Sequence, residues 1–134
     1  MMTYEEKVRF LKSYRIAKEN AETYMRQIED LRETMLPSGV HISDMPKHPS
    51  YEDQMAKYAG EFWEIQQRLE QAQKKQLRVI AVINQIAETD PLGHRILTER
   101  YVYGEKTDVV CRTCYVSRKT EWKYRRNAIE RLKI

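Results

Sequence analysis

The chain has little glycine, proline or cysteine: four glycines, four prolines and two cysteines among 134 residues. Glycine and proline end regular elements and form turns, so their scarcity, with a third of the residues charged, predicts a mostly helical chain with few turns. No apolar run approaches the roughly 20 residues needed to span a bilayer. The first residues, Met1–Lys7, lack the apolar core of a signal peptide. We therefore expect a cytoplasmic protein that does not associate with membranes.

The two cysteines, Cys111 and Cys114, form a CxxC motif. A structural zinc ion needs about four ligands, and the three histidines (His41, His48, His94) lie elsewhere in the sequence. A redox CxxC belongs in a thioredoxin-like βαβ context, which this sequence does not offer. The cysteines are therefore interpreted as small buried residues, and we expect neither a metal nor a cofactor.

Catalytic patterns are also lacking. The sequence has no glycine-rich phosphate loop, and its carboxylates are spread along helix faces at spacings typical of solvated surfaces. We do not expect an enzyme.

Residues 1–88 carry apolar residues alternately three and four apart in two segments, which is the a/d pattern of packed helices. In the first segment these are Phe10, Tyr14, Ala17, Ala21, Tyr24, Ile28, Leu31 and Met35; in the second they are Met55, Tyr58, Phe62, Ile65, Leu69, Ala72, Val79, Ile83 and Ile86, interrupted by Gln76. Tyr4, Val8 and Leu11 extend the first helix backwards with a change of phase. Gln76 either fixes the register or occupies a hydrated helix crossing.

Three prolines and a glycine lie between the two segments and stop the first helix. They predict a loop over residues 37–50 and hence an antiparallel helical hairpin. Trp63, Leu77 and Ile80 lie off the second apolar pattern. An additional apolar face usually has a partner, which could be the C-terminal domain or a second copy of the chain. We predict a homodimer through the long helices, with residues 1–88 as the oligomerisation segment.

The C-terminal forty residues differ in charge from the rest. Residues 95–134 hold eleven Lys and Arg against five Asp and Glu, a net charge of +6, whereas residues 1–94 have a net charge of −2. Asp90-Pro91 is a helix start signal, and helices are predicted over about 91–103, 107–113 and 118–132. A basic three-helix segment predicts a helix-turn-helix domain over residues 89–134 that binds a polyanion.

The last predicted helix begins after Ser117, which can cap it. Its inward stripe is predicted to be Tyr124, Ala128, Ile129 and Leu132. In a helix-turn-helix the first half of the second helix enters the major groove of double-stranded DNA, so the candidate DNA-binding residues are Arg112, Thr113, Arg118, Lys119, Thr120, Trp122, Lys123 and Arg126. We predict Arg118 and Lys123 as base readers, and Arg112 and Lys119 as phosphate contacts. Trp122 either packs on the DNA or is buried against the preceding helix.

The stretch Leu97-Thr98-Glu99-Arg100-Tyr101-Val102-Tyr103-Gly104 resembles the opening of sigma-70 region 4-like helix-turn-helix domains. Val116-Ser117 matches the hydrophobic-Ser turn of that family, and Ala128-Ile129 with Leu132 matches its closing pattern. Departures occur at Lys106-Thr107, where the family has an aromatic residue or a Ser-Trp pair. They also occur at Cys114-Tyr115, where Leu-Gly is usual, and at Glu121, where an apolar residue is usual.

The residues Ile42–Lys47 resemble a motif between the long helices of small phage proteins of the ArpU/RinA-like group. The two resemblances together imply a phage or prophage transcriptional regulator of late or lysis-type genes, acting in a bacterial host cell. Two alternatives remain open. One is a small terminase-like subunit that recognises DNA for packaging; the other is an adaptor that binds RNA polymerase without reading DNA.

Overall fold

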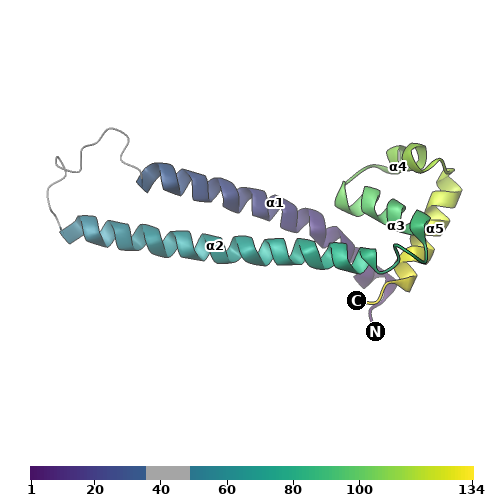
Figure 1. Cartoon of the computed structure of the whole chain (residues 1–134), viewed down its shortest axis with the longest axis horizontal. Helices are drawn as coiled ribbons and strands as arrows, with labels where there is room; N and C mark the ends of the chain where they lie inside the picture. Colours follow the sequence, from purple (N-terminus) through teal and green to yellow (C-terminus); the bar gives the residue numbers. More distant parts are fainter. Residues whose placement is uncertain (36–48) are drawn as a thin grey trace. The chain divides into compact units, whose positions relative to one another are not determined.

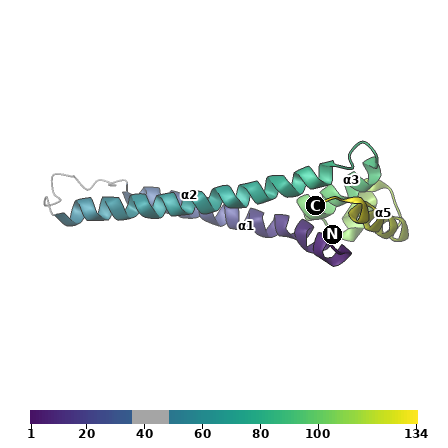
Figure 2. The same ribbon diagram turned by 90° about the horizontal axis from the view of Figure 1, so that it is seen from below.

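The computed structural model describes residues 1–35 and 49–134, and every regular element in these two ranges is helical. Two long helices, α1 (Tyr4–Met35) and α2 (Pro49–Asn84), run antiparallel side by side, and short helices follow (Figures 1 and 2). The expectation of an all-α chain, with a long hairpin before small C-terminal helices, is confirmed. None of the described helices is long and apolar enough to cross a membrane.

Only the last two residues of the predicted loop can be compared with the structure. Residues 37–48, with the Ile42–Lys47 motif, lie outside the described residues. Pro49 and Ser50, which we predicted to end the loop, instead form the first turn of α2. Proline has no N–H to contribute and a fixed φ that suits the first helical position, so a proline that closes a loop also starts a helix well.

Contacts divide the chain into two compact units. The first unit contains Met1–Lys18 and Lys74–Ile134, and the second contains Glu19–Gln73. The boundary that we predicted between residues 88 and 89 therefore lies inside the first unit. The open ends of the long helices belong with the short helices because they share one hydrophobic core.

The core of the first unit joins side chains from the long helices to side chains from the short ones. Leu11 and Val79 are fully buried, and they belong to the same cluster as Leu97, Ala128 and Ile129. Tyr4 and Val8 pack against this cluster. The change of phase at Tyr4, Val8 and Leu11 thus turns a second apolar stripe of α1 toward the short helices.

The second unit is a simple helix pair with its own small core. Ala21 and Ile28 of α1 cluster with Leu69 and Ala72 of α2, and partly buried aromatic and aliphatic residues pack around them. These are positions of the predicted a/d pattern. Trp63 stands outside this core, with 63% of its surface exposed.

The short helices begin at the predicted cap. The side chain of Asp90 accepts a hydrogen bond of 3.0 Å from the backbone N–H of Gly93 at the start of α3 (Pro91–Leu97). The chain continues as a π-helical turn, η2 (Thr98–Val102), and then α4 (Thr107–Cys114) and α5 (Arg118–Arg131). α3 packs on both α4 and α5. Gly93 allows this approach, because an added Cβ would lie 3.0 Å from the Cβ of Ala128 and would collide with the Asp90 carboxyl group.

Candidate nucleic-acid interface

α4, a three-residue turn and α5 have the lengths and order of a helix-turn-helix. The Ser117 hydroxyl accepts a hydrogen bond of 3.2 Å from the Thr120 N–H, so the predicted cap of α5 is present. Tyr115 ends α4 in the left-handed conformation, with φ of 55°, and its side chain is 92% exposed. Glycine adopts this conformation at no steric cost, so Tyr115 holds a strained backbone position that a glycine would fill without strain.

The CxxC motif lies in α4 and contributes to its packing. Cys114 is buried beside Val110 and Ile96, whereas Cys111 is half-buried. Burial raises the pKa of the Cys114 thiol, because a thiolate is poorly solvated there. Within the described residues no group of His, Cys, Asp and Glu side chains is arranged to hold a metal ion.

The inward face of α5 differs from the predicted stripe at one end. Ala128, Ile129 and Leu132 are buried as expected, but Tyr124 is 38% exposed. Its predicted place is taken by Glu121, whose side chain is fully buried. The predicted stripe took account of apolar residues only. The helix instead places the Glu121 carboxylate in the core, where two guanidinium groups lie close to it.

Glu121 is held by two guanidinium groups. Its Oε1 lies 3.2 Å from Nε of Arg125, one turn later in α5, and 3.8 Å from Nη1 of Arg100 in η2. Arg100 also donates a hydrogen bond of 2.6 Å to the Thr107 hydroxyl in α4. Arg100 and Glu121 thereby connect η2, α4 and α5, so this ion-pair cluster fixes how α5 sits on its neighbours.

Neither oxygen of Glu121 accepts a hydrogen bond within the described part of the chain, and Nε of Arg125 donates none. The cluster therefore depends on charge pairing alone at these atoms. Nearby, burial raises the pKa of the Tyr101 phenol, while the Arg100 and Arg125 charges act in the opposite direction.

The exposed face of α5 carries the predicted lysines. Lys119 and Lys123 are one turn apart and both are exposed, and neither forms an ion pair within the described residues. Trp122 is 53% exposed, so the alternative in which it is buried against the preceding helix is wrong. Thr120 is half-buried at the start of the helix, where its N–H is used by the Ser117 cap.

The two predicted arginines of α5 have partners inside the unit. Arg118 forms an exposed ion pair with Asp108 of α4. The Arg126 guanidinium lies over the ring of Tyr4, 4.9 Å from its centroid, and 5.6 Å from the Trp122 ring. Arg126 also pairs with Glu130 at 3.4 Å. Both arginines remain exposed, but each would exchange an existing contact for one with DNA.

On α4, Arg112 is exposed and Thr113 is half-buried. The hydroxyl of Thr107, at the start of α4, accepts the hydrogen bond from Arg100. Sequence reasoning missed Asp108 as the partner of Arg118. It also missed Asn127, an exposed residue one turn beyond Lys123. An amide side chain can donate to and accept from adenine in the major groove, and its i+4 spacing from Lys123 was a usable signal.

No family model, no curated protein and no solved structure matches this chain.

Proposed function

We propose that this chain is a sequence-specific DNA-binding transcriptional regulator of phage or prophage genes, which acts in the cytoplasm of a bacterial host. In this proposal α5 enters the major groove, and no catalytic step is assigned to the chain. The observation that carries it is the pair of exposed lysines on α5, Lys119 and Lys123, which have no ion-pair partner among the described residues and follow directly after the Ser117 cap. Exposed cations on such a helix attract phosphates and donate hydrogen bonds to guanine.

The contacts of α5 suggest a division of roles. Lys119 and Lys123 have no ion-pair partner among the described residues that would have to be released before they bind DNA. We assign phosphate contact to Lys119 and base contact to Lys123. Arg118 becomes a reader only after it leaves Asp108. Arg126 is held beside Trp122 by Tyr4, so its role combines positioning Trp122 with neutralising phosphate.

Replacing both Lys119 and Lys123 with alanine is expected to weaken binding to random duplex DNA and to flatten the plot of log affinity against log salt by about one, because only Lys119 is assigned to a phosphate. The measurement is a titration of fluorescent duplex at several salt concentrations. Arg26→Ala with Arg32→Ala is the matched control, because it removes two exposed cations from the second unit. If the lysine variant keeps its circular dichroism spectrum and binds like the wild type, α5 is not the DNA-binding helix and the polymerase-adaptor alternative moves ahead.

We also propose that the chain forms a homodimer through the second unit. Trp63 is 63% exposed, and Ala59 and Ala56 precede it by four and seven residues on the same exposed face of α2. Ile80, which we had grouped with Trp63, packs against the core of the first unit and needs no partner. Large aromatic residues such as Trp63 are enriched in protein–protein interfaces.

Light scattering at micromolar concentration should give the mass of a dimer, and Trp63→Glu should give that of a monomer. Gln27→Glu adds the same charge at another exposed position of the second unit and should leave the dimer intact. A wild-type monomer would contradict the proposal. A larger ring-like oligomer would favour the terminase-like alternative.

A further inference from the structure

The two compact units have opposite charge. The first unit carries nineteen Lys and Arg against nine Asp and Glu, a net charge of +10, while the second carries five against eleven, a net charge of −6. The helix-turn-helix segment alone does not account for this. The ends of the long helices that belong to the first unit add eight cations: Lys7, Arg9, Lys12, Arg15, Lys18, Lys74, Lys75 and Arg78. The basic surface of the first unit therefore extends onto α1 and α2.

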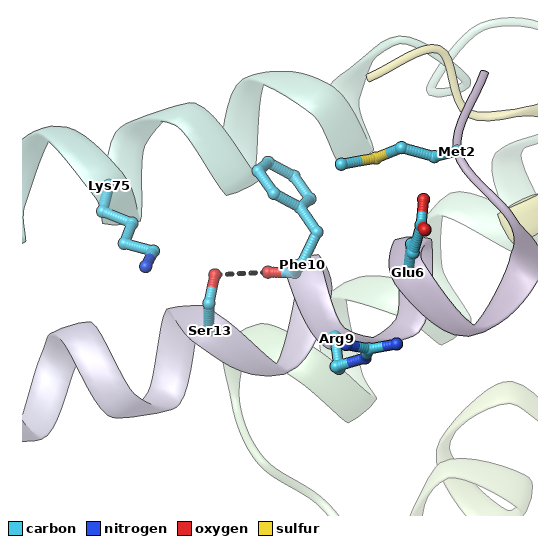
Figure 3. A pocket seen from close by; sticks show the side chains of 6 residues that line it. All are labelled: Met2, Glu6, Arg9, Phe10, Ser13 and Lys75. Carbon is cyan, nitrogen blue, oxygen red and sulfur yellow. Dashed lines mark hydrogen bonds between the residues drawn. The ribbon is translucent and has the colours of Figure 1, made fainter.

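A groove of about 330 Å³ lies between these helix ends. Figure 3 shows Phe10 projecting from α1 toward α2, with Lys75 of α2 on one side and Met2 on the other. Arg9, Ser13 and Glu6 complete the lining. The guanidinium of Arg78 lies 5.6 Å from the centroid of the Phe10 ring, at the same groove.

The cations in and beside this groove form no ion pairs among the described residues. Arg9, Lys75 and Arg78 are exposed, and none of them is paired with a carboxylate in the described residues. Glu6, the one acid in the lining, already accepts a hydrogen bond of 3.2 Å from the Thr3 N–H in a capping box. With Glu6 counted against Arg9, Lys75 and Arg78, the groove and its edge carry a net charge of +2 (3 − 1) beside the Phe10 ring.

Contacts connect the start of α1 to α5. Tyr4 of α1 lies against Arg126, and Lys7 donates a hydrogen bond of 2.9 Å to the Glu130 carbonyl. Met2 lines both this groove and a second one that includes Arg131 and Lys133. The start of α1, which lines the groove, is thus fixed to α5 within the first unit.

We propose that this groove is a second DNA-binding element, in which Arg9, Lys75 and Arg78 hold the phosphate backbone of the duplex whose major groove α5 enters. The proposal rests on the proposed function. A duplex is favoured as the occupant because the first unit, which also contains α5, carries a net charge of +10, and exposed cations bind a duplex by neutralising its closely spaced phosphates. Such contacts position a protein without reading sequence.

The test compares two triple variants of the full chain on random duplex DNA. One is Arg9→Gln/Lys75→Gln/Arg78→Gln in the groove. The other is Arg26→Gln/Arg32→Gln/Arg68→Gln in the second unit, which removes the same charge elsewhere. Each phosphate contact adds about 0.9 to the salt slope. The groove variant should therefore flatten the slope by about 2.7, which makes the loss of affinity between 50 and 200 mM salt about 40-fold smaller. The control should keep the wild-type slope.

An unchanged slope in the groove variant, or equal flattening in both triple variants, would overturn the proposal. If the Lys119/Lys123 variant loses binding while the groove variant matches the wild type, α5 binds DNA and the groove does not. The proposed function then stands, and the proposal for the groove falls. If wild type binds no duplex, both proposals fall. Weaker binding of poly-glutamate by the groove variant, with its DNA slope unchanged, would assign the groove to an acidic protein segment and would also overturn the proposal.

Discussion

Replacing Glu121 with alanine is expected to lower the free energy of unfolding of the first unit by about 3–5 kcal/mol. The side chain is fully buried and lies 3.2 Å from the Arg125 guanidinium, which is itself only 16% exposed. Removing the carboxylate leaves Arg125 desolvated and without its counter-charge, and also removes a partner of Arg100. Urea unfolding followed by fluorescence of Trp122, in a Trp63→Phe background, measures the change next to the mutated position.

Two further variants separate burial from charge pairing. Glu130→Ala removes an exposed carboxylate that also has an arginine four residues away, Arg126, and it should change stability by less than about 1 kcal/mol. Glu121→Leu with Arg125→Leu replaces the buried pair by apolar groups, and it should recover most of the loss because both desolvation costs disappear. A Glu121→Ala variant as stable as Glu130→Ala would show that the cluster does not hold α5.

The same cluster shows which parts of the site the sequence could predict. The Ser117 and Asp90 caps and the α5 start follow from local hydrogen bonding, so they were predictable from neighbouring residues. The buried Glu121 was only partly predictable: its nearer partner, Arg125, lies four residues later in the same helix, but Arg100 comes from another element 21 positions earlier. The ion pair between Arg118 and Asp108 was missed for the same reason.

The hairpin itself was predictable because its signal is periodic. Apolar residues three and four apart fix the facing sides of α1 and α2 whatever surrounds them. The extent of the C-terminal domain was harder, because the residues that complete its core lie near the other end of the chain. The phase change at Tyr4, Val8 and Leu11 is visible in the sequence. The sequence does not show, however, that the short helices pack against these three residues.

That shared core leads to the second large expected effect. Leu11→Ala should lower the stability of the first unit by about 2–5 kcal/mol, because it removes a fully buried side chain and leaves a cavity. The effect should reach α5, although Leu11 lies in the long helix α1. Hydrogen exchange of backbone amides, read by mass spectrometry, should show faster exchange throughout α3, α4 and α5. Ile16→Ala is the control on the same helix, since Ile16 is 60% exposed and its removal should change exchange little.

The isolated segment 89–134 tests the same dependence without a substitution. Its Leu97, Ala128 and Ile129 would face water where Leu11, Val79 and Ile83 cover them in the full chain. A segment this short buries too little apolar surface to fold readily by itself, so circular dichroism of the isolated peptide should show mostly lost helix. A well-folded peptide, or a Leu11→Ala chain whose α5 exchanges like the wild type, would mean that the helix-turn-helix is an independent domain. Either result would place the proposed DNA-binding element outside the influence of the long helices, contrary to the core that Leu11 shares with Leu97, Ala128 and Ile129.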